Sequence, residues 1–206
     1  CIDGMRLVQS GAITRYLAKK HHLCGDGTVE QEVLCDMLND SITDWRTMGY
    51  GPFEFSLSYE PTHDQLTKLA HANEKYLPLF ERQLRKNNKD PEDHTSDYYL
   101  KQLRKNPNHT NDYFIKDPED QSLLYLVGTQ YTYPDFRLWE LLVEMVPPIM
   151  RTPFFMGTKY PLVAGYFLQL QHHAGIQQFV ASAQRKTKTQ DGIPAYKTTV
   201  MTSLGY

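Results

Sequence analysis

Residues 131–148 read YTYPDFRLWELLVEMVPP, and this stretch decides the fold of the chain. Thr132 and Asp135 are spaced as a helix N-cap and its reciprocal partner, and Tyr131 and Phe136 flank them as a hydrophobic staple. The apolar residues that follow cover most of the circumference of the predicted helix. Such a helix is buried on several sides, so we expect it at the centre of a helical domain.

Helical patterns lie on both sides of this central helix. A capping box at Thr28 opens an amphipathic helix that reaches Met48, and a second box at Thr62 opens another that is bent near Pro78. Shorter helical patterns begin near Pro161 and near Ile176. The predicted fold class is therefore mainly α.

The first residues of the chain predict a hairpin followed by a helix. Residues 2–5 read IDGM, in which an Asp-Gly pair between apolar residues is typical of a tight β-turn. Residues 6–8 continue as the outgoing strand, and a helical pattern starts at Ser10 and is closed by Gly25. Beyond this hairpin, little of the chain is predicted to form strand.

Composition excludes several classes of protein. The chain has 206 residues and a net charge of -2, so no overall positive field favours nucleic acid. Its mean hydropathy is -0.55, and no apolar run has the length of a membrane span, so we expect no membrane insertion. Cys1, Cys24 and Cys35 are odd in number and lack zinc-site spacing, which favours a reduced, cytoplasmic compartment.

Residues 86–122 form an apparent insertion. The stretch is rich in Asn, Asp, Lys, His and Pro, and it is far longer than a usual connection between packed helices. Two short motifs, QLRKN and DPED, each occur twice at unequal spacings, which argues against a solenoid repeat. A partner-binding loop, a disordered excursion and retained non-coding sequence all remain open.

Two groups of polar residues are candidates for binding. Gln9 and Ser10 lie at a strand-to-helix junction, where unpaired N–H groups and the helix dipole attract an anion such as a carboxylate. An ordinary Ser10 N-cap is the alternative. Asp36, Asp40 and Asp44 share one helix face, which is usually a solvated face, and we expect no metal site there.

Several motifs together resemble one known family over nearly the whole chain outside the insertion. They are DGM at 3–5, LVQS at 7–10, RYLA at 15–18, YLPLFE at 76–81, YLVG at 125–128, the capping box at 132–135 and YPL at 160–162. In order and approximate spacing they closely resemble the cytosolic glutathione transferases. The stretch 184–192 is similar to the alpha class.

The resemblance implies a domain organisation. Residues 1–25 would be the last strand and helix of a thioredoxin-like, glutathione-binding α/β domain, and 26–206 an all-helical C-terminal domain that carries the insertion. The chain starts at Cys1 within the thioredoxin-like unit, so we expect an N-terminal truncation. The family's sulfur-activating residue would lie upstream of Cys1, and no residue of this chain is assigned that catalytic role.

The resemblance also implies binding residues for glutathione, which is a substrate here rather than a cofactor. Gln9 and Ser10 match positions that hold its γ-glutamyl end, and Val8 corresponds to a backbone position close to it. Asp44 matches an acidic residue that reaches the glutathione of the other subunit in a homodimer, and Lys75 matches a basic position of some alpha-class members. Gly11 departs from the alpha-class pattern, which often has Arg at the two-fold interface.

The implied activity is attack by the glutathione thiolate on hydrophobic electrophiles, as in detoxification. From position and hydrophobicity we expect Trp45, Met48, Val200 and Leu204 to line the electrophile pocket. The competing hypothesis is a non-catalytic binding or structural protein on the same scaffold, such as a carrier of apolar ligands.

Overall fold

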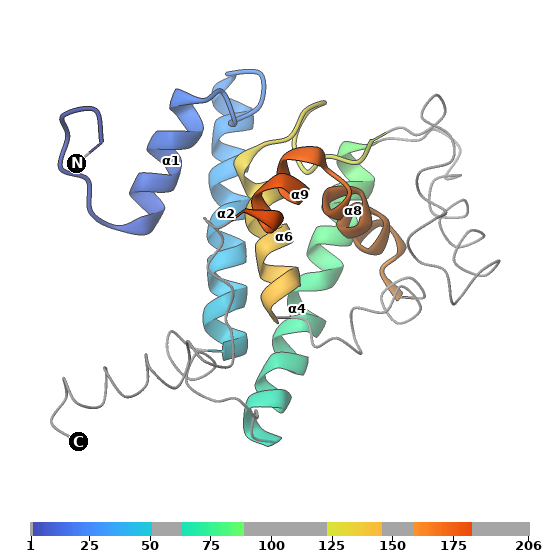
Figure 1. Ribbon diagram of the computed structural model, residues 1–206. Coiled ribbons are helices and arrows are strands. Elements are labelled where there is room, and N and C mark those ends of the chain that lie inside the picture. The colour runs from blue at the N-terminus through green and yellow to red at the C-terminus, as the bar shows by residue number, and fades with distance from the viewer. Residues whose placement is uncertain (1, 51–62, 89–122, 146–158, 183–206) are drawn as a thin grey trace, which may run out of the picture.

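A computed structural model describes residues 2–50, 63–88, 123–145 and 159–182 (Figure 1). The regular structure in these ranges is helical, as the sequence predicts. Its six helices are α1 (Ser10–Lys20), α2 (Val29–Tyr50), α4 (His63–Asn87), α6 (Tyr133–Met145), α8 (Pro161–Gln171) and α9 (Ala174–Ala181). None of the helices in these ranges is both long enough and apolar enough to cross a lipid bilayer.

The helices form a bundle with α1 at its edge. The long helices α2 and α4 pack against each other, α6 packs on α2, and α8 packs on both α4 and α6. Figure 1 shows α1 in blue on the side of α2 that faces away from α4. The residues expected at the start of the glutathione site therefore lie at the periphery of the bundle, and its core lies elsewhere.

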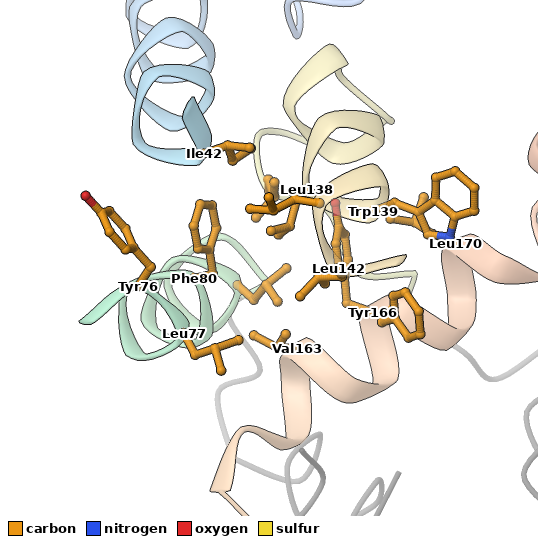
Figure 2. Packing of buried hydrophobic residues seen from close by; sticks show 14 of the residues in the cluster. Ile42, Tyr76, Leu77, Phe80, Leu138, Trp139, Leu142, Val163, Tyr166 and Leu170 are labelled. Carbon is orange, nitrogen blue, oxygen red and sulfur yellow. The ribbon is translucent and has the colours of Figure 1, made fainter. Parts of the chain in front are cut away.

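The core lies where α4, α6 and α8 meet, as Figure 2 shows. Leu138 and Leu142 of α6 are fully buried, which confirms the prediction that this helix is covered on several sides. Trp45 of α2 stacks on Tyr76 and Phe80 of α4 with ring centroids 5.9 and 5.7 Å apart. Aromatic stacking thus joins the two long helices.

Helix α8 is more central than its sequence pattern indicates. The sequence predicts only a short helix near Pro161, yet every side chain of 161–168 is buried. Tyr166 is completely buried although it carries a hydroxyl group. A helix that is apolar nearly all round must be covered by other elements, so α8 shares the centre with α6.

The Asp135 carboxylate organises the N-terminus of α6. It accepts hydrogen bonds from the Thr132 N–H at 2.7 Å and the Thr132 hydroxyl at 2.6 Å. It also accepts the Leu126 N–H at 3.0 Å and the Tyr166 hydroxyl at 2.7 Å. Burial raises the pKa of Asp135, while these hydrogen bonds favour the charged form. The carboxylate therefore both caps α6 and holds α8.

The predicted staple forms at this helix start, and the capping box forms in part: the Thr132 N–H donates to Asp135, while the Asp135 N–H donates to the Thr132 carbonyl in place of its hydroxyl. The rings of Tyr131 and Phe136 lie 6.0 Å apart across the Thr132 cap. At α2 the predicted capping box takes a different form. The Gln31 side chain accepts the Asp26 N–H and donates to the Asp26 carboxylate, in place of accepting the Thr28 N–H. Asp26 accepts that Thr28 N–H itself, at 3.0 Å. Asp26 therefore takes part in capping α2, together with Thr28 and Gln31.

The N-terminal turn forms, but the outgoing strand does not. Ile2 and Met5 exchange two backbone hydrogen bonds of 2.9 Å, with positive φ at Asp3 and Gly4 as the Asp-Gly turn requires. The expected strand over 6–8 is not assigned as strand. A strand needs a hydrogen-bonded neighbour, and among the described residues Ile2 and Met5 form one isolated bridge pair.

Side chains of α1 hold this turn. The Tyr16 hydroxyl and the Lys20 ammonium each donate to Asp3 at 2.6 Å. The hydrogen bond from Lys20, followed by that from Tyr16, lowers the pKa of Asp3. The turn and α1 are therefore one polar-linked unit.

The end of α4 is fastened to the segment before α6. The helix continues to Asn87, past the expected insertion start at residue 86, and the rest of the insertion lies outside the described residues. The Asn87 amide donates to the carbonyls of Tyr125 at 2.9 Å and Gly128 at 2.8 Å. Asn88 exchanges two hydrogen bonds with the Tyr125 backbone. These amides bring together the two sides of the insertion.

Candidate functional site

The candidate site begins at the N-terminus of α1, where Val8, Gln9 and Ser10 are all exposed. Gln9 occupies the N-cap position and its side chain makes no capping hydrogen bond. Ser10 is the first helical residue, so the alternative in which Ser10 is an ordinary N-cap is wrong. The reason is that Gln9, with φ 71° and ψ 114°, is the last residue with a non-helical backbone.

The backbone at Gln9 is strained. A positive φ is uncommon for a residue with a side chain, and such conformations concentrate at ligand sites and switch regions. The Gln9 carbonyl accepts the Ile13 N–H at 3.0 Å, which leaves the preceding N–H groups of the first turn without helical partners. A strained residue, exposed donors and an exposed hydroxyl thus coincide at one helix end, an arrangement that suits a carboxylate.

Arg15 connects α1 to α2. Its Nε lies 3.1 Å from Oδ1 of Asp36, and its Nη2 donates to Oδ1 of Asp40. Lys19, one turn further along α1, pairs with Glu32 at 2.8 Å. Two cations spaced by four residues on one helix therefore face carboxylates spaced by four on the other.

This pairing divides the row of three aspartates. Arg15 pairs with both Asp36 and Asp40, whereas Asp44 is exposed and makes no hydrogen bond or ion pair with another described residue. Asp36 also accepts the Tyr133 hydroxyl at 2.6 Å. Asp44, one helical turn beyond Asp40, is the member of the row available to a ligand.

Lys75 lies on α4 and is exposed. Its Nζ lies 4.9 Å from the centroid of the Tyr76 ring, which is itself stacked on Trp45. A cation–π contact of this kind restrains the ammonium group without neutralising it. Lys75 thus has a defined place next to the aromatic stack that joins α2 and α4.

The expected electrophile pocket is only partly within the described residues. Trp45 was expected in its wall, but the side chain is 2% exposed and its indole N–H donates to Asn73 at 2.9 Å. Trp45 is a core residue, because Tyr76 and Phe80 of α4 both stack against its ring. Met48 is half-buried against the core, and Val200 and Leu204 lie outside the described residues.

An apolar groove lies between α2 and α4. It has a volume of about 310 Å³, and Leu34, Met37, Leu38, Leu79 and Phe80 form most of its lining. Val29 and Val33 extend the apolar surface along α2 from Met37, and these three side chains are each more than half exposed. Apolar surface that continues from a groove is typical of an interaction site.

The two described cysteines are not candidate nucleophiles. Cys24 and Cys35 are buried and free, as the sequence suggests for small apolar residues. Burial raises the pKa of the Cys35 thiol to about 12, and it also raises the pKa of Cys24. Both thiols therefore remain protonated near neutral pH.

Sequence analysis missed the strain at Gln9 and the role of Arg15. Nothing in the local sequence marks the positive φ, because no glycine stands there. The Arg15 contact did leave a signal, since Arg15 and Lys19 share one face of α1, and Glu32, Asp36 and Asp40 share one face of α2. Matching the two charge patterns would have predicted the helix pairing.

Comparison with known proteins identifies relatives that match the chain over most of its length. Glutathione S-transferase alpha M14 of Sus scrofa is 36% identical over 196 residues, which are 92% of this chain and 68% of the relative. Glutathione S-transferase A4 of Mus musculus is 24% identical over 195 residues, 93% of this chain and 68% of the relative. No protein-family model matches the chain.

Solved structures agree with the fold. The crystal structure of a major nematode-specific GST from C. elegans superposes with a TM-score of 0.59 at 18% sequence identity. The match covers 89% of this chain and 71% of that chain. At this identity the similarity establishes the fold alone, which is mainly helical in the described residues of this chain.

Proposed function

Since the chain belongs to the glutathione S-transferase family, we propose that it takes part in conjugating the glutathione thiolate to hydrophobic electrophiles. The strained Gln9 backbone beside the exposed start of α1 carries this proposal, because it lies where the resemblance places the γ-glutamyl end of glutathione. A positive φ at this point turns the chain so that the Ser10 hydroxyl and the first N–H groups of α1 are exposed together.

Each binding residue has a chemical role in this proposal. The first-turn N–H groups and the Ser10 hydroxyl donate to the γ-glutamyl carboxylate, the Gln9 amide assists, and Val8 contributes its backbone. Asp44 binds the glutathione ammonium of a partner subunit, and Lys75 approaches a glutathione carboxylate. The availability of Asp44 supports its role, because Arg15 binds only the two preceding aspartates.

The assignment of Asp44 requires a homodimer, and the apolar surface on α2 supports one. We place a second copy of this chain over the groove between α2 and α4 and over the stripe formed by Val29, Val33 and Met37. Burying such a stripe stabilises association in proportion to its apolar area. With Gly11 at the position where alpha-class members often have Arg, apolar contact would contribute a larger share of the dimer's stability.

The electrophile pocket is proposed to involve Met48 together with Val200 and Leu204. Trp45 supports it from the core and does not form its surface. We place the activity in the cytoplasm as a step of detoxification, and the buried, unpaired thiols of Cys24 and Cys35 suit a reduced compartment. No residue of the chain is assigned the sulfur-activating role, so we expect slow turnover from these 206 residues.

Binding of S-hexylglutathione, measured by isothermal titration calorimetry, tests the proposal. Ser10→Ala should weaken binding about tenfold, since it removes a hydrogen bond to a charged group. Ser182→Ala is the matched control, because Ser182 follows the end of α9 and its hydroxyl, among the described residues, donates to the Phe179 carbonyl. Absence of binding by the unmodified chain would overturn the proposal.

Turnover separates the two functional hypotheses. Conjugation of glutathione to 1-chloro-2,4-dinitrobenzene, followed by absorbance, supports the transferase when it exceeds the uncatalysed rate and falls in Ser10→Ala. Binding of S-hexylglutathione without any turnover would favour the non-catalytic scaffold protein. Analytical ultracentrifugation of the same sample tests the homodimer.

A further inference from the structure

We propose that Arg15 is a positioning residue for the glutathione site, an inference that rests on the proposed function. Arg15 does not touch the ligand in this proposal. It fixes α1 on α2 and sets the charge around the start of α1, so that Gln9 and Ser10 meet an anionic ligand in the correct place.

The first argument is how little apolar contact holds α1. Ala18 is the single buried residue among the eleven of this helix, and its side chain is one methyl group. Leu17 is exposed. Burial of one methyl group contributes too little to define how a helix lies on its neighbour. With Ile13 only half-buried as well, the polar contacts of Arg15 and Lys19 are a main part of what holds α1 on α2.

The second argument is the geometry of the Arg15 contact. The guanidinium bridges two carboxylates that are one turn apart on α2, Asp36 through Nε and Asp40 through Nη2. Such a fork fixes both the rotation and the axial position of α1, which a single ammonium contact cannot do. The Arg15 side chain is 32% exposed and that of Lys19 is 56% exposed, so the guanidinium is the less solvated of the two cations.

The third argument is that the acceptor is itself held by the core. Asp36 accepts the hydroxyl of Tyr133, a buried residue in the first turn of α6. The Tyr133 N–H donates to the Leu23 carbonyl at 2.8 Å, just after α1. A closed chain of contacts thus runs from Arg15 through Asp36 and Tyr133 back to the segment that follows α1. Arg15 transmits the rigid position of α6 to α1.

The fourth argument is electrostatic. Arg15 is five residues from Ser10, or about 7.5 Å along the helix axis, which is within the screening length of physiological salt. Removing the guanidinium would leave Asp36 and Asp40 as uncompensated negative charges near a site that must accept a carboxylate. Arg15 therefore favours binding of the anionic ligand in two ways: it places α1, and its charge offsets the nearby carboxylates.

The test compares Arg15→Met with Lys19→Met in the 206-residue chain. Lys19→Met breaks the other ion pair between α1 and α2, on the same helix face but one turn further from Ser10. Affinity for S-hexylglutathione should fall about tenfold in Arg15→Met and less than twofold in Lys19→Met. In the conjugation assay Arg15→Met should raise KM for glutathione with little change in kcat, because ground-state and transition-state binding weaken equally.

Arg15→Lys and Asp40→Asn keep the proposal testable if Arg15→Met folds poorly. Arg15→Lys retains the charge but loses the fork, so its affinity should lie between those of the unmodified chain and Arg15→Met. Asp40→Asn should weaken binding less than Arg15→Met, because one arm of the fork remains. Circular dichroism verifies that the variants have equal helix content.

The outcomes distinguish this inference from the proposed function. Failure of the unmodified chain to bind S-hexylglutathione would remove the proposed function and this inference with it. Normal binding by the unmodified chain with equal affinities for folded Arg15→Met and Lys19→Met would overturn the positioning role alone. A loss in Arg15→Met that Arg15→Lys partly restores would support it.

Discussion

Helices α1 and α8 have the same length, eleven residues each, but they are held in opposite ways. Nearly every side chain of α8 is buried between α4 and α6, whereas α1 buries only Ala18 and is joined to α2 by ion pairs. The difference teaches that the core of this fold and its candidate ligand end depend on different forces. Apolar packing stabilises the bundle, and partly exposed charge places the site.

The largest effect is expected at the buried carboxylate that joins α6 to α8. Asp135→Ala leaves four buried donors, two on Thr132 and one each on Leu126 and Tyr166, without their acceptor. We expect a loss of about 3–5 kcal/mol in the free energy of unfolding, measured by urea denaturation. Asp135→Asn keeps one acceptor and should cost less. A loss below about 1 kcal/mol for Asp135→Ala would show that this network does not hold α8.

An intermediate effect is expected where Glu81 caps α8. Its carboxylate accepts the Leu162 and Val163 N–H groups at 3.2 and 2.9 Å. Burial raises the pKa of Glu81 in spite of these hydrogen bonds, so folding favours its protonated form. Its pH-dependent contribution is therefore present below the unfolded pKa of about 4.3 and is lost as pH rises through the folded pKa.

The matched variant for this prediction is Glu81→Gln, which cannot titrate. The stability of the unmodified chain relative to Glu81→Gln should decrease as pH rises from about 4 through the raised pKa of Glu81, measured by urea denaturation at each pH. A difference that increases with pH would contradict the prediction. It would mean that the hydrogen bonds from the two N–H groups lower the pKa of Glu81 by more than burial raises it.

The smallest effect is expected at α1. Lys19→Met should change the free energy of unfolding by less than about 1 kcal/mol, since Lys19 is largely exposed. Amide hydrogen exchange sharpens the contrast between the helices: raising the salt concentration should speed exchange in α1 and leave α8 unchanged, because salt screens ion pairs. Equal responses in the two helices would refute the division into charge-held and apolar-held parts.

Much of the fold could be predicted because its signals are local. The capping boxes at Thr28 and Thr132 and the Tyr131–Phe136 staple each involve residues within one helical turn, and the structure confirms the helices that they open. The outgoing strand over 6–8 was wrong because strand formation depends on a neighbouring strand and not on local pattern alone. The domain boundary that the sequence analysis places at residue 25 stays a prediction.

The candidate site was less predictable for the same reason. The resemblance was enough to name Val8, Gln9 and Ser10. It did not predict the strained backbone of Gln9, because no residue type in the local sequence indicates a positive φ there. Trp45 was assigned to a pocket because it is apolar and well placed in the sequence. Its burial depends on Tyr76 and Phe80, which approach only when α4 packs on α2.

The sequence by itself determined where helices begin and that the helix after Thr132 is central, because caps and apolar periodicity act over a few residues. Only the tertiary structure decided which charges meet. Asp36, Asp40 and Asp44 are equivalent in the sequence pattern, yet Arg15 binds the first two and leaves the third available. That distinction arises from how α1 lies on α2, and it is a property of two helices in contact rather than of either one.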